Sequence, residues 1–357
     1  MQKIMIYFYS ILIFSWAFFV ALFAIPSIIQ VAHSKQLLDI PNSRRLHLFD
    51  TPRLGGLAIF AGLISALMLF GEINNAVQKL IAATIIIFFI GLKDDMVSVS
   101  AFKKFFVQVL AASIVVFLGD LKIESFQGVF GITVLPDGIS YFFTLIVVLG
   151  ITNAFNLIDG LDGLAGTIAV LTCLFYGYIF MSVGGAASHP YALVCFCLTG
   201  ALLGFLRYNI FKAQIFMGDT GSLISGFVVA FLAVKIIALY ENNGYNLISL
   251  PAVAIAPILL PLADTLRVFV LRVLAGYSPF TPDSNHLHHR LMALGFSSLS
   301  IVCLMFLCTI CSISAAMLMT QVNQTVLLIG MFGGIFILMA FIEIIYKKRT
   351  KACISNL

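Results

Sequence analysis

Eleven long apolar segments constrain this chain more than any other feature of its sequence. A helix needs about 20 mostly apolar residues to cross a bilayer, and the segments are close to that length or longer. Runs so uniformly apolar predict helices, because strands of a membrane barrel alternate in polarity over about ten residues. We therefore predict an all-α, polytopic integral membrane protein with 10 or 11 transmembrane helices, at residues 4–32, 54–71, 76–92, 102–119, 139–156, 163–183, 190–206, 221–240, 247–270, 298–320 and 325–346.

The composition indicates a membrane protein without a soluble domain. Hydrophobic residues make up 61% of the 357 residues and charged residues only 10%, and the mean hydropathy is +1.10. Soluble domains carry about 25% charged residues. So many spans leave no room for a soluble domain of ordinary size. Residues 1–357 are therefore expected to form a single integral domain that contacts the lipid bilayer and no nucleic acid.

Lysine and arginine are distributed unequally between the two sides of the predicted bundle. Sixteen of the 20 fall on one side and four on the other, namely Lys3, Lys79, Lys122 and Lys235. Short loops rich in these residues tend to stay in the cytoplasm. We therefore expect the N-terminus outside and the C-terminus inside, as an odd number of spans requires.

Six carboxylates gather at the same, cytoplasmic side. An ionisable group near the bilayer is costly unless a pocket accommodates it, and acidic residues have no general reason to prefer the side already rich in Lys and Arg. They therefore indicate one shared site. The carboxylates are Asp94, Asp95, Asp159, Asp162, Asp219 and Asp264. The loops expected to form the site lie at about 33–53, 93–102, 157–162, 207–220 and 271–297.

Asp94 and Asp95 end the third apolar segment, in the motif GLKDD. Adjacent residues do not share a helix face, so one carboxylate is available for a cation or base role while the other is held by hydrogen bonds. Lys103 and Lys104, at the start of the next segment, supply positive charge nearby. The alternative is a solvated acidic helix end.

The motif NAFNLIDGLDGLAG at 153–166 carries a polar residue at every third position, namely Asn153, Asn156, Asp159 and Asp162. This spacing would form one stripe on a continuous helix. Gly160 and Gly163 predict instead that the helix ends there and that backbone amides approach a ligand. A broken helix end with amides and carboxylates suits a nucleotide with its metal.

A glycine-rich motif, RYNIFKAQIFMGDTGSLISG at 207–226, places Asp219, Thr220 and Ser222 among three glycines. We predict a tight turn where the eighth span begins, with a carboxylate and two hydroxyls suited to phosphate or metal. It is not a Walker loop, because GK[ST] is absent. Phe216, just before the turn, is a candidate for stacking on a base, and an interfacial anchor is the alternative.

Four basic side chains crowd into the last cytoplasmic loop, PDSNHLHHRL at 282–291, namely His286, His288, His289 and Arg290. A zinc site is the rival interpretation. However, no cysteine lies nearby and the spacing is not the His-x-x-x-His of a helical zinc site. Cationic and hydrogen-bonding contacts with a diphosphate are therefore favoured.

These four motifs, in this order, resemble those of the polyprenyl-phosphate N-acetylhexosamine-1-phosphate transferases, from DIPNSRRLHLFDTPRLGG at 39–56 to HLHHR at 286–290. The resemblance implies an enzyme of the bacterial inner membrane that uses Mg²⁺, with Mn²⁺ as a substitute. Such an enzyme transfers N-acetylhexosamine 1-phosphate from a UDP-N-acetylhexosamine to undecaprenyl phosphate and releases UMP. This is the first step of cell-envelope polysaccharides such as lipopolysaccharide O-antigen. A homodimer is compatible with the resemblance.

The resemblance also implies roles for individual residues. The implied catalytic set is Asp94, Asp95, Lys104, Asp159 and Asp219. Mg²⁺ is expected on Asp219, with help from Asn156 or Asp159. Gly160, Leu161 and Asp162 are expected to hold the uridine, and Phe216 to stack on its uracil. Asn156 and Asn209 are expected to make further polar contacts. The pyrophosphate and the sugar are expected to be recognised by His286, His288, His289 and Arg290.

Two further functions are alternatives to this one. The pentapeptide translocases resemble HHHFE in the last loop, whereas HLHHR resembles enzymes of simple N-acetylhexosamines. GlcNAc 1-phosphate is therefore favoured over phospho-MurNAc-pentapeptide. A secondary transporter would place its polar residues near the bilayer midplane, whereas these lie at one surface. Direct attack by the lipid phosphate and a covalent aspartyl-phosphate route are both open.

Overall fold

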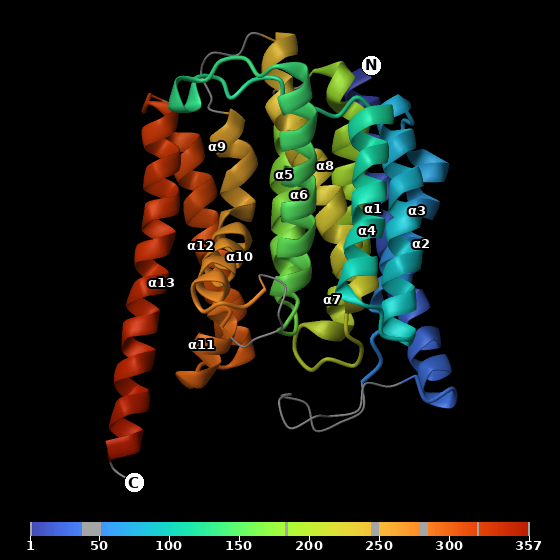
Figure 1. The fold of residues 1–357 in the computed structure, drawn as a ribbon. Helices are drawn as coiled ribbons and strands as arrows, with labels where there is room; N and C mark the ends of the chain where they lie inside the picture. Colours follow the sequence, from blue (N-terminus) through green and yellow to red (C-terminus); the bar gives the residue numbers. More distant parts are fainter. Residues whose placement is uncertain are drawn as a thin grey trace.

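The computed structural model describes residues 2–37, 51–182, 185–243, 250–278, 285–319 and 321–355. These residues form a bundle of long helices, with no β-strand among them (Figure 1). In chain order the elements are α1 (Gln2–Ser34), α2 (Gly55–Phe70), α3 (Asn75–Met96), α4 (Ala101–Ser113), η1 (Ile114–Leu118), η2 (Val129–Gly131), α5 (Asp137–Ile158), α6 (Leu164–Ser182), η3 (Ala186–Ser188), α7 (His189–Asn209), α8 (Gly218–Asn243), α9 (Leu250–Ile255), η4 (Ala256–Ile258), α10 (Leu259–Leu274), α11 (Leu287–Ala293), α12 (Ser298–Leu318) and α13 (Gln324–Ser355).

Every predicted apolar segment corresponds to a helix or to consecutive helices of this bundle. Ten stretches of the described residues are long and apolar enough to cross a membrane, and α2, with 16 residues, is a shorter apolar helix. The ends of the chain lie at opposite ends of the bundle (Figure 1), which agrees with an odd number of crossings. The prediction of an all-α, multi-pass membrane protein is confirmed.

Helix α8 is the most deeply buried helix of the bundle. It packs against α2, α3, α5, α6 and α9, and 83% of the residues in its apolar window are buried. Phe227 and Phe231 lie within it without solvent contact. A helix that is apolar all round is buried on every side, so the neighbours of α8 fix the position of its first turn.

Glycines let three backbones meet at that first turn. The N–H groups of Gly55 and Gly56 donate to the carbonyl oxygens of Phe216 and Met217, both at 2.9 Å. On α3, a Cβ atom at Gly91 would lie 2.5 Å from the Cα atom of Thr220. The starts of α2 and α8 and the end of α3 are therefore in direct backbone contact.

The C-terminal helices stand together on one side of the bundle, with α11 near their lower ends (Figure 1). Helix α11 carries most of the histidine motif and packs against α12 and α13. Parts of two predicted site loops, 38–50 and 279–284, lie outside the described residues.

We expect Gly91→Ala to destabilise the protein, because its methyl group would meet the backbone of α8. Overpacking of this kind costs about 1–3 kcal/mol. The matched control is Gly150→Ala on α5, where nothing lies within 4 Å of the added Cβ. Thermal midpoints of the purified proteins in detergent provide the measurement. Equal midpoints for the two variants would contradict the close contact between α3 and α8.

Candidate active site

Polar side chains from α3, α4, α5 and α8 meet at the start of α8. The ammonium group of Lys104 donates to the carboxylate of Asp94 at 3.1 Å and also to that of Asp219. The amide of Asn156 donates to Asp219, at 3.2 Å, and to the hydroxyl of Ser222, at 3.0 Å. The first three sequence motifs are thus joined in one network, with Asp219 between a cation and an amide.

Asp94 and Asp95 have different partners, as their adjacent positions predict. The carboxylate of Asp95 accepts hydrogen bonds from the N–H groups of Asp219 and Thr220, at 2.7 and 2.9 Å, and from the hydroxyl of Thr220 at 2.5 Å. The first N–H groups of a helix have no partner within it, so Asp95 of α3 caps α8 from outside. Asp94 accepts from the N–H of Val99 at 2.6 Å and faces Lys104.

The second motif breaks where its glycines predict. Helix α5 ends at Ile158, and Asp159 is its C-cap residue. Burial first, and then the nearby carboxylate of Asp219, raise the pKa of Asp159 well above its usual value. Asp159 therefore lies near enough to Asp219 for the charge of one to affect the pKa of the other.

Asn209 holds the turn after α5 in place. Its side-chain oxygen accepts from the N–H of Gly163 at 2.7 Å, and its amide donates to the carbonyl of Ile215 at 2.9 Å. The side chain of Leu161 is buried in the apolar core. Nucleotide contacts by Leu161, Asp162 and Asn209 stay predictions, whereas the support that Asn209 gives to this turn is observed.

A buried carboxylate holds the histidine motif against α10. Asp264 accepts from the N–H of Leu287, at 3.1 and 3.2 Å, and pairs with His286 Nδ1 and Arg267 Nη2, each at 2.9 Å. Arg267 also donates to the carbonyl of Asn285 at 2.5 Å. The start of α11 is therefore fixed by one carboxylate and one guanidinium.

His288 links the fourth motif to the second. A Cβ atom at Gly160 would lie 2.5 Å from His288 Nε2, so this glycine makes room for the ring. The rings of His286 and His288 stack with centroids 5.8 Å apart, and that of His289 lies 4.3 Å from His288. Within the described part of the chain, neither buried ring nitrogen of His288 has a hydrogen-bond partner. These nitrogens are candidates for contact with a ligand.

The sequence favours cationic contacts between the histidine motif and a diphosphate, but His288 does not carry a positive charge near pH 7. Burial, followed by the neighbouring His289 and His286, lowers the pKa of His288 to about 3. The ring is therefore neutral near pH 7. It can donate or accept a hydrogen bond but adds no positive charge to a diphosphate site.

Arg290 contacts the C-terminal helix. Its Nε atom lies 3.1 Å from the carboxylate of Glu343, and its guanidinium carbon lies 4.4 Å from the ring centroid of Tyr346. It also donates to the side-chain oxygen of Asn285 at 2.5 Å. In this arrangement Glu343 balances the charge of Arg290, and contact with a diphosphate stays a prediction.

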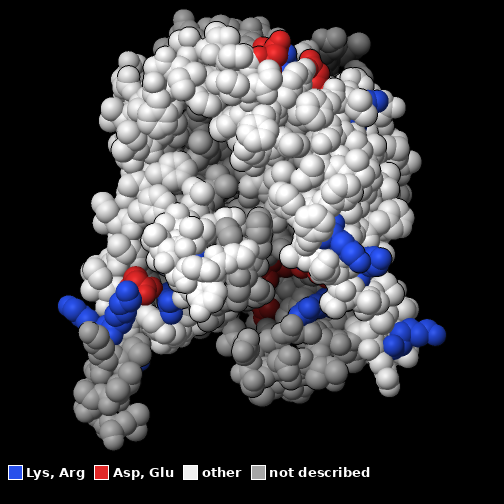
Figure 2. Space-filling view, in the orientation of Figure 1, with Lys and Arg blue, Asp and Glu red and all other residues white. Residues whose placement is uncertain are grey.

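Figure 2 shows acidic side chains recessed in a hollow in the lower half of the molecule, with basic side chains near its edge.

Phe216 precedes α8, and its backbone bonds to Pro52 and Gly55, at 2.8 and 2.9 Å, fix its position. Its ring is partly exposed. Stacking of Phe216 on uracil stays a prediction.

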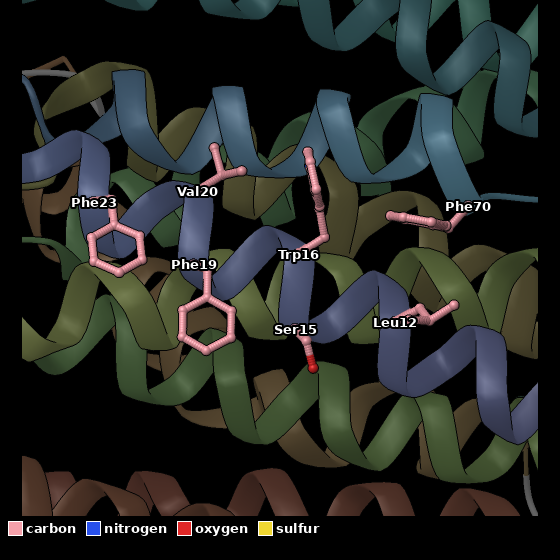
Figure 3. A pocket seen from close by; sticks show the side chains of 7 residues that line it. All are labelled: Leu12, Ser15, Trp16, Phe19, Val20, Phe23 and Phe70. Atoms are coloured by element: carbon pink, nitrogen blue, oxygen red, sulfur yellow. The ribbon is translucent and has the colours of Figure 1, made fainter.

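An apolar groove lies away from this network, between α1 and α2 (Figure 3), with a volume of about 500 Å³. Its lining offers no charged group that could bind a phosphate. The polar hollow is therefore the better candidate for an active site. The groove is lined by Leu12, Ser15, Trp16, Phe19, Val20, Phe23 and Phe70.

Comparison with known proteins identifies the family. Residues 77–237 match the model of glycosyl transferase family 4. A probable undecaprenyl-phosphate N-acetylglucosaminyl 1-phosphate transferase of Bacillus subtilis is 34% identical over 336 residues, which cover 92% of this chain and 90% of the relative. A decaprenyl-phosphate N-acetylglucosaminephosphotransferase of Mycobacterium tuberculosis is 34% identical over 289 residues, covering 75% and 72%. An undecaprenyl-phosphate alpha-N-acetylglucosaminyl 1-phosphate transferase of Escherichia coli K12 is 30% identical over 274 residues, also covering 75% and 72%.

The chain belongs to the polyprenyl-phosphate N-acetylhexosamine-1-phosphate transferase family. The resemblance predicted from the motifs is confirmed. The matched family region of this transferase contains the whole network of Asp94, Asp95, Lys104, Asn156 and Asp219, whereas the histidine motif lies beyond it.

The side chains of this site suit a magnesium ion that substrate phosphates help to bind better than they suit a metal held by protein ligands alone. Among the described residues, no three His, Cys, Asp or Glu side chains gather in a way that would hold a metal. Mg²⁺ takes oxygen ligands and usually binds one or two carboxylates together with substrate phosphates. Asp219 and the adjacent Asn156 amide supply oxygen atoms of this kind, and a contribution from Asp159 stays a prediction.

Sequence reasoning missed three supporting residues of this transferase. The sequence places Asp264 among the six clustered carboxylates but indicates no partner for it, and its contacts with the histidine motif are revealed only by the fold. The sequence predicts the Thr220 hydroxyl as suited to phosphate or metal, whereas in the structure this hydroxyl donates to Asp95. Glu343, the partner of Arg290, lies in an apolar segment far along the chain, and no local pattern marks it.

We expect Asp95→Asn to destabilise the protein more than Asp94→Asn. An amide at position 95 places an NH₂ group against N–H donors at the start of α8, and an unsatisfied buried group costs about 1–3 kcal/mol. At position 94 an amide oxygen can still accept from Val99. Thermal midpoints in detergent should fall by several degrees for Asp95→Asn and change little for Asp94→Asn. The capping role is wrong if the order is reversed.

We expect His288 to make stability fall with falling pH. An unfolded histidine has a pKa near 6.5, whereas that of His288 is lowered to about 3. Below about pH 6.5 the unfolded chain therefore binds a proton that the folded chain does not, and between pH 7 and 5 this costs at most about 2 kcal/mol. The thermal midpoint of the His288→Gln variant should consequently drop a few degrees less over this interval than that of the unmodified protein. Identical drops would show that His288 takes up its proton in the folded state.

Proposed function

We propose that this transferase moves N-acetylhexosamine 1-phosphate, with GlcNAc 1-phosphate favoured, from a UDP-sugar to undecaprenyl phosphate. An oxygen of the lipid phosphate forms a bond to the β-phosphorus of the donor. The bond from that phosphorus to the bridging oxygen breaks, and UMP leaves with the electron pair. The products are UMP and polyprenyl diphosphate N-acetylhexosamine, the first lipid-linked intermediate of a cell-envelope polysaccharide.

The observation that carries this proposal is the network of Lys104, Asp94, Asp219 and Asn156 at the ends of four membrane helices. The reaction brings three negatively charged phosphates together, so neutralisation of charge is the main requirement for catalysis. The network lies where α3 ends and where α4 and α8 begin, and Figure 2 shows acidic side chains in a hollow in the lower half of the molecule. A lipid headgroup and a water-soluble nucleotide can meet at such a hollow. A transporter site would lie near the bilayer midplane instead.

Each residue has a role in this proposal that follows from its partners. Lys104 presents positive charge to the phosphates while it stays paired with Asp94, and Asp94 orders the lipid phosphate through that shared ammonium group. A general base is not obligatory, because a phosphate monoester is largely ionised at pH 7, with a second pKa near 6. This favours direct displacement over an aspartyl-phosphate intermediate. His288 offers a neutral hydrogen bond to the sugar or the diphosphate.

Magnesium would be held by Asp219 with Asn156 or Asp159, and when bound it would supply positive charge to the donor diphosphate. The excess of Lys and Arg on one side supports a cytoplasmic site in the bacterial inner membrane, with the C-terminus on the same side. The homodimer stays a prediction.

The test is UMP release from UDP-GlcNAc by purified protein in nanodiscs, with and without undecaprenyl phosphate and Mg²⁺. We expect release only when both are present. Asp219→Asn should lower the rate by roughly 100-fold or more, while the protein remains folded. The matched control is Asp137→Asn, an exposed carboxylate in the first turn of α5, at the opposite end of that helix from the network. Near-normal turnover by Asp219→Asn would rule out its proposed role.

A further inference from the structure

A second groove, with a volume of about 460 Å³, lies between the end of α3 and the start of α4. Ile90, Val99, Phe102 and Phe106 give it an apolar lining, and Lys93 and Lys103 add two ammonium groups. Phe102 and Phe106 are 78% and 63% exposed, on a stretch of helix long and apolar enough to lie in the bilayer. The groove therefore combines an apolar surface with positive charge at the membrane boundary.

The two lysines are separate from the active-site network, although they are its neighbours in sequence. Lys93 precedes Asp94 and Lys103 precedes Lys104, and consecutive helical residues point about 100° apart. Asp94 and Lys104 bond to each other, whereas Lys93 and Lys103 line the groove. Neither groove lysine has an ion-pair partner in the described part of the chain. Sequence reasoning grouped Lys103 with Lys104, and the structure separates them.

We infer that this groove binds an anionic phospholipid of the bilayer, with its phosphate between Lys93 and Lys103 and the first part of an acyl chain against Phe102 and Phe106. Basic pockets at the cytoplasmic ends of membrane helices recognise anionic headgroups in this way. Free phosphate would make no use of the apolar lining. A reacting polyprenyl phosphate must instead reach Asp94 and Lys104.

Because of the position of the groove, a bound lipid would hold α3 and α4 together. The groove joins α3, which carries Asp94 and Asp95, to α4, which carries Lys104. A lipid across both helices stabilises the short connection between them, of which Val99 is part. The proposal goes beyond the reaction proposed above, and its test does not depend on transferase activity.

The experiment measures binding of phosphatidylglycerol to detergent-purified protein by native mass spectrometry, with phosphatidylcholine as the neutral lipid. We expect the double variant Lys93→Gln/Lys103→Gln to raise the Kd of the first phosphatidylglycerol roughly 30-fold. The matched control is Lys347→Gln/Lys348→Gln, which removes the same charge from the end of α13 and should change the Kd less than twofold. Phosphatidylglycerol should also raise the thermal midpoint of the unmodified protein more than that of the groove variant.

Three outcomes would overturn the inference: equal binding of the two phospholipids, an equal effect of the two double variants, or displacement of phosphatidylglycerol by inorganic phosphate or equimolar undecaprenyl phosphate. The last result would make the groove a phosphate or acceptor site. If the double variant does not fold in detergent, the single variant Lys103→Gln replaces it, with an expected rise in Kd of about fivefold. An unchanged Kd in that variant counts against the inference.

Discussion

The hydrogen bonds from the first turn of α8 to Asp95 are the constraint on which the rest of the site depends. A helix of such apolar composition could settle at several depths in a bundle. The exposed N–H groups at its start, however, need acceptors, and within a membrane protein an unpaired group costs several kcal/mol. Asp95 satisfies two of them together with the hydroxyl of Thr220. That contact fixes α8 against α3, and the glycines at 55, 56 and 91 allow the backbones to come close enough for it.

The fixed position of α8 places Asp219 close to other carboxylates, and its negative charge therefore needs positive or hydrogen-bond-donating partners. It lies one residue inside the helix start, where the partial positive charge of the N-terminus stabilises a carboxylate. Lys104 and Asn156 supply the remaining donors. The reaction requires positive charge and hydrogen-bond donors next to phosphates. Lys104 and Asn156, which donate to Asp94 and Asp219 in this structure, are groups of that kind. In the proposed reaction, the same charges that pair with one another without substrate become available to the phosphates when substrate binds.

Local signals made much of this predictable. Uniform hydropathy gave the helices, and Gly160 and Gly218 marked the end of α5 and the start of α8. Because the motifs of Asp94, Asn156 and Asp219 are predicted on the same side of the membrane, their meeting in one site could also be predicted. What sequence reasoning could not reach were partners far apart along the chain. Whether Asp94 or Asp95 would cap α8 depends on the rotation of α3, and the pairing of Arg290 with Glu343 depends on where α13 docks. Neither is encoded in a local pattern.

The histidine motif shows how such long-range partners limit the chemistry of a loop. Asp264 holds His286 and the start of α11 from one side, while Glu343 and Tyr346 hold Arg290 from the other. Between them, burial keeps the His288 ring neutral near pH 7. The charge of Arg290 is already balanced by Glu343, whereas His288 can offer a hydrogen bond without losing any partner within the described residues. In the proposed reaction, we therefore expect recognition of the donor by this loop to begin with a neutral hydrogen bond at His288, and charge from Arg290 to follow where the phosphates outcompete Glu343.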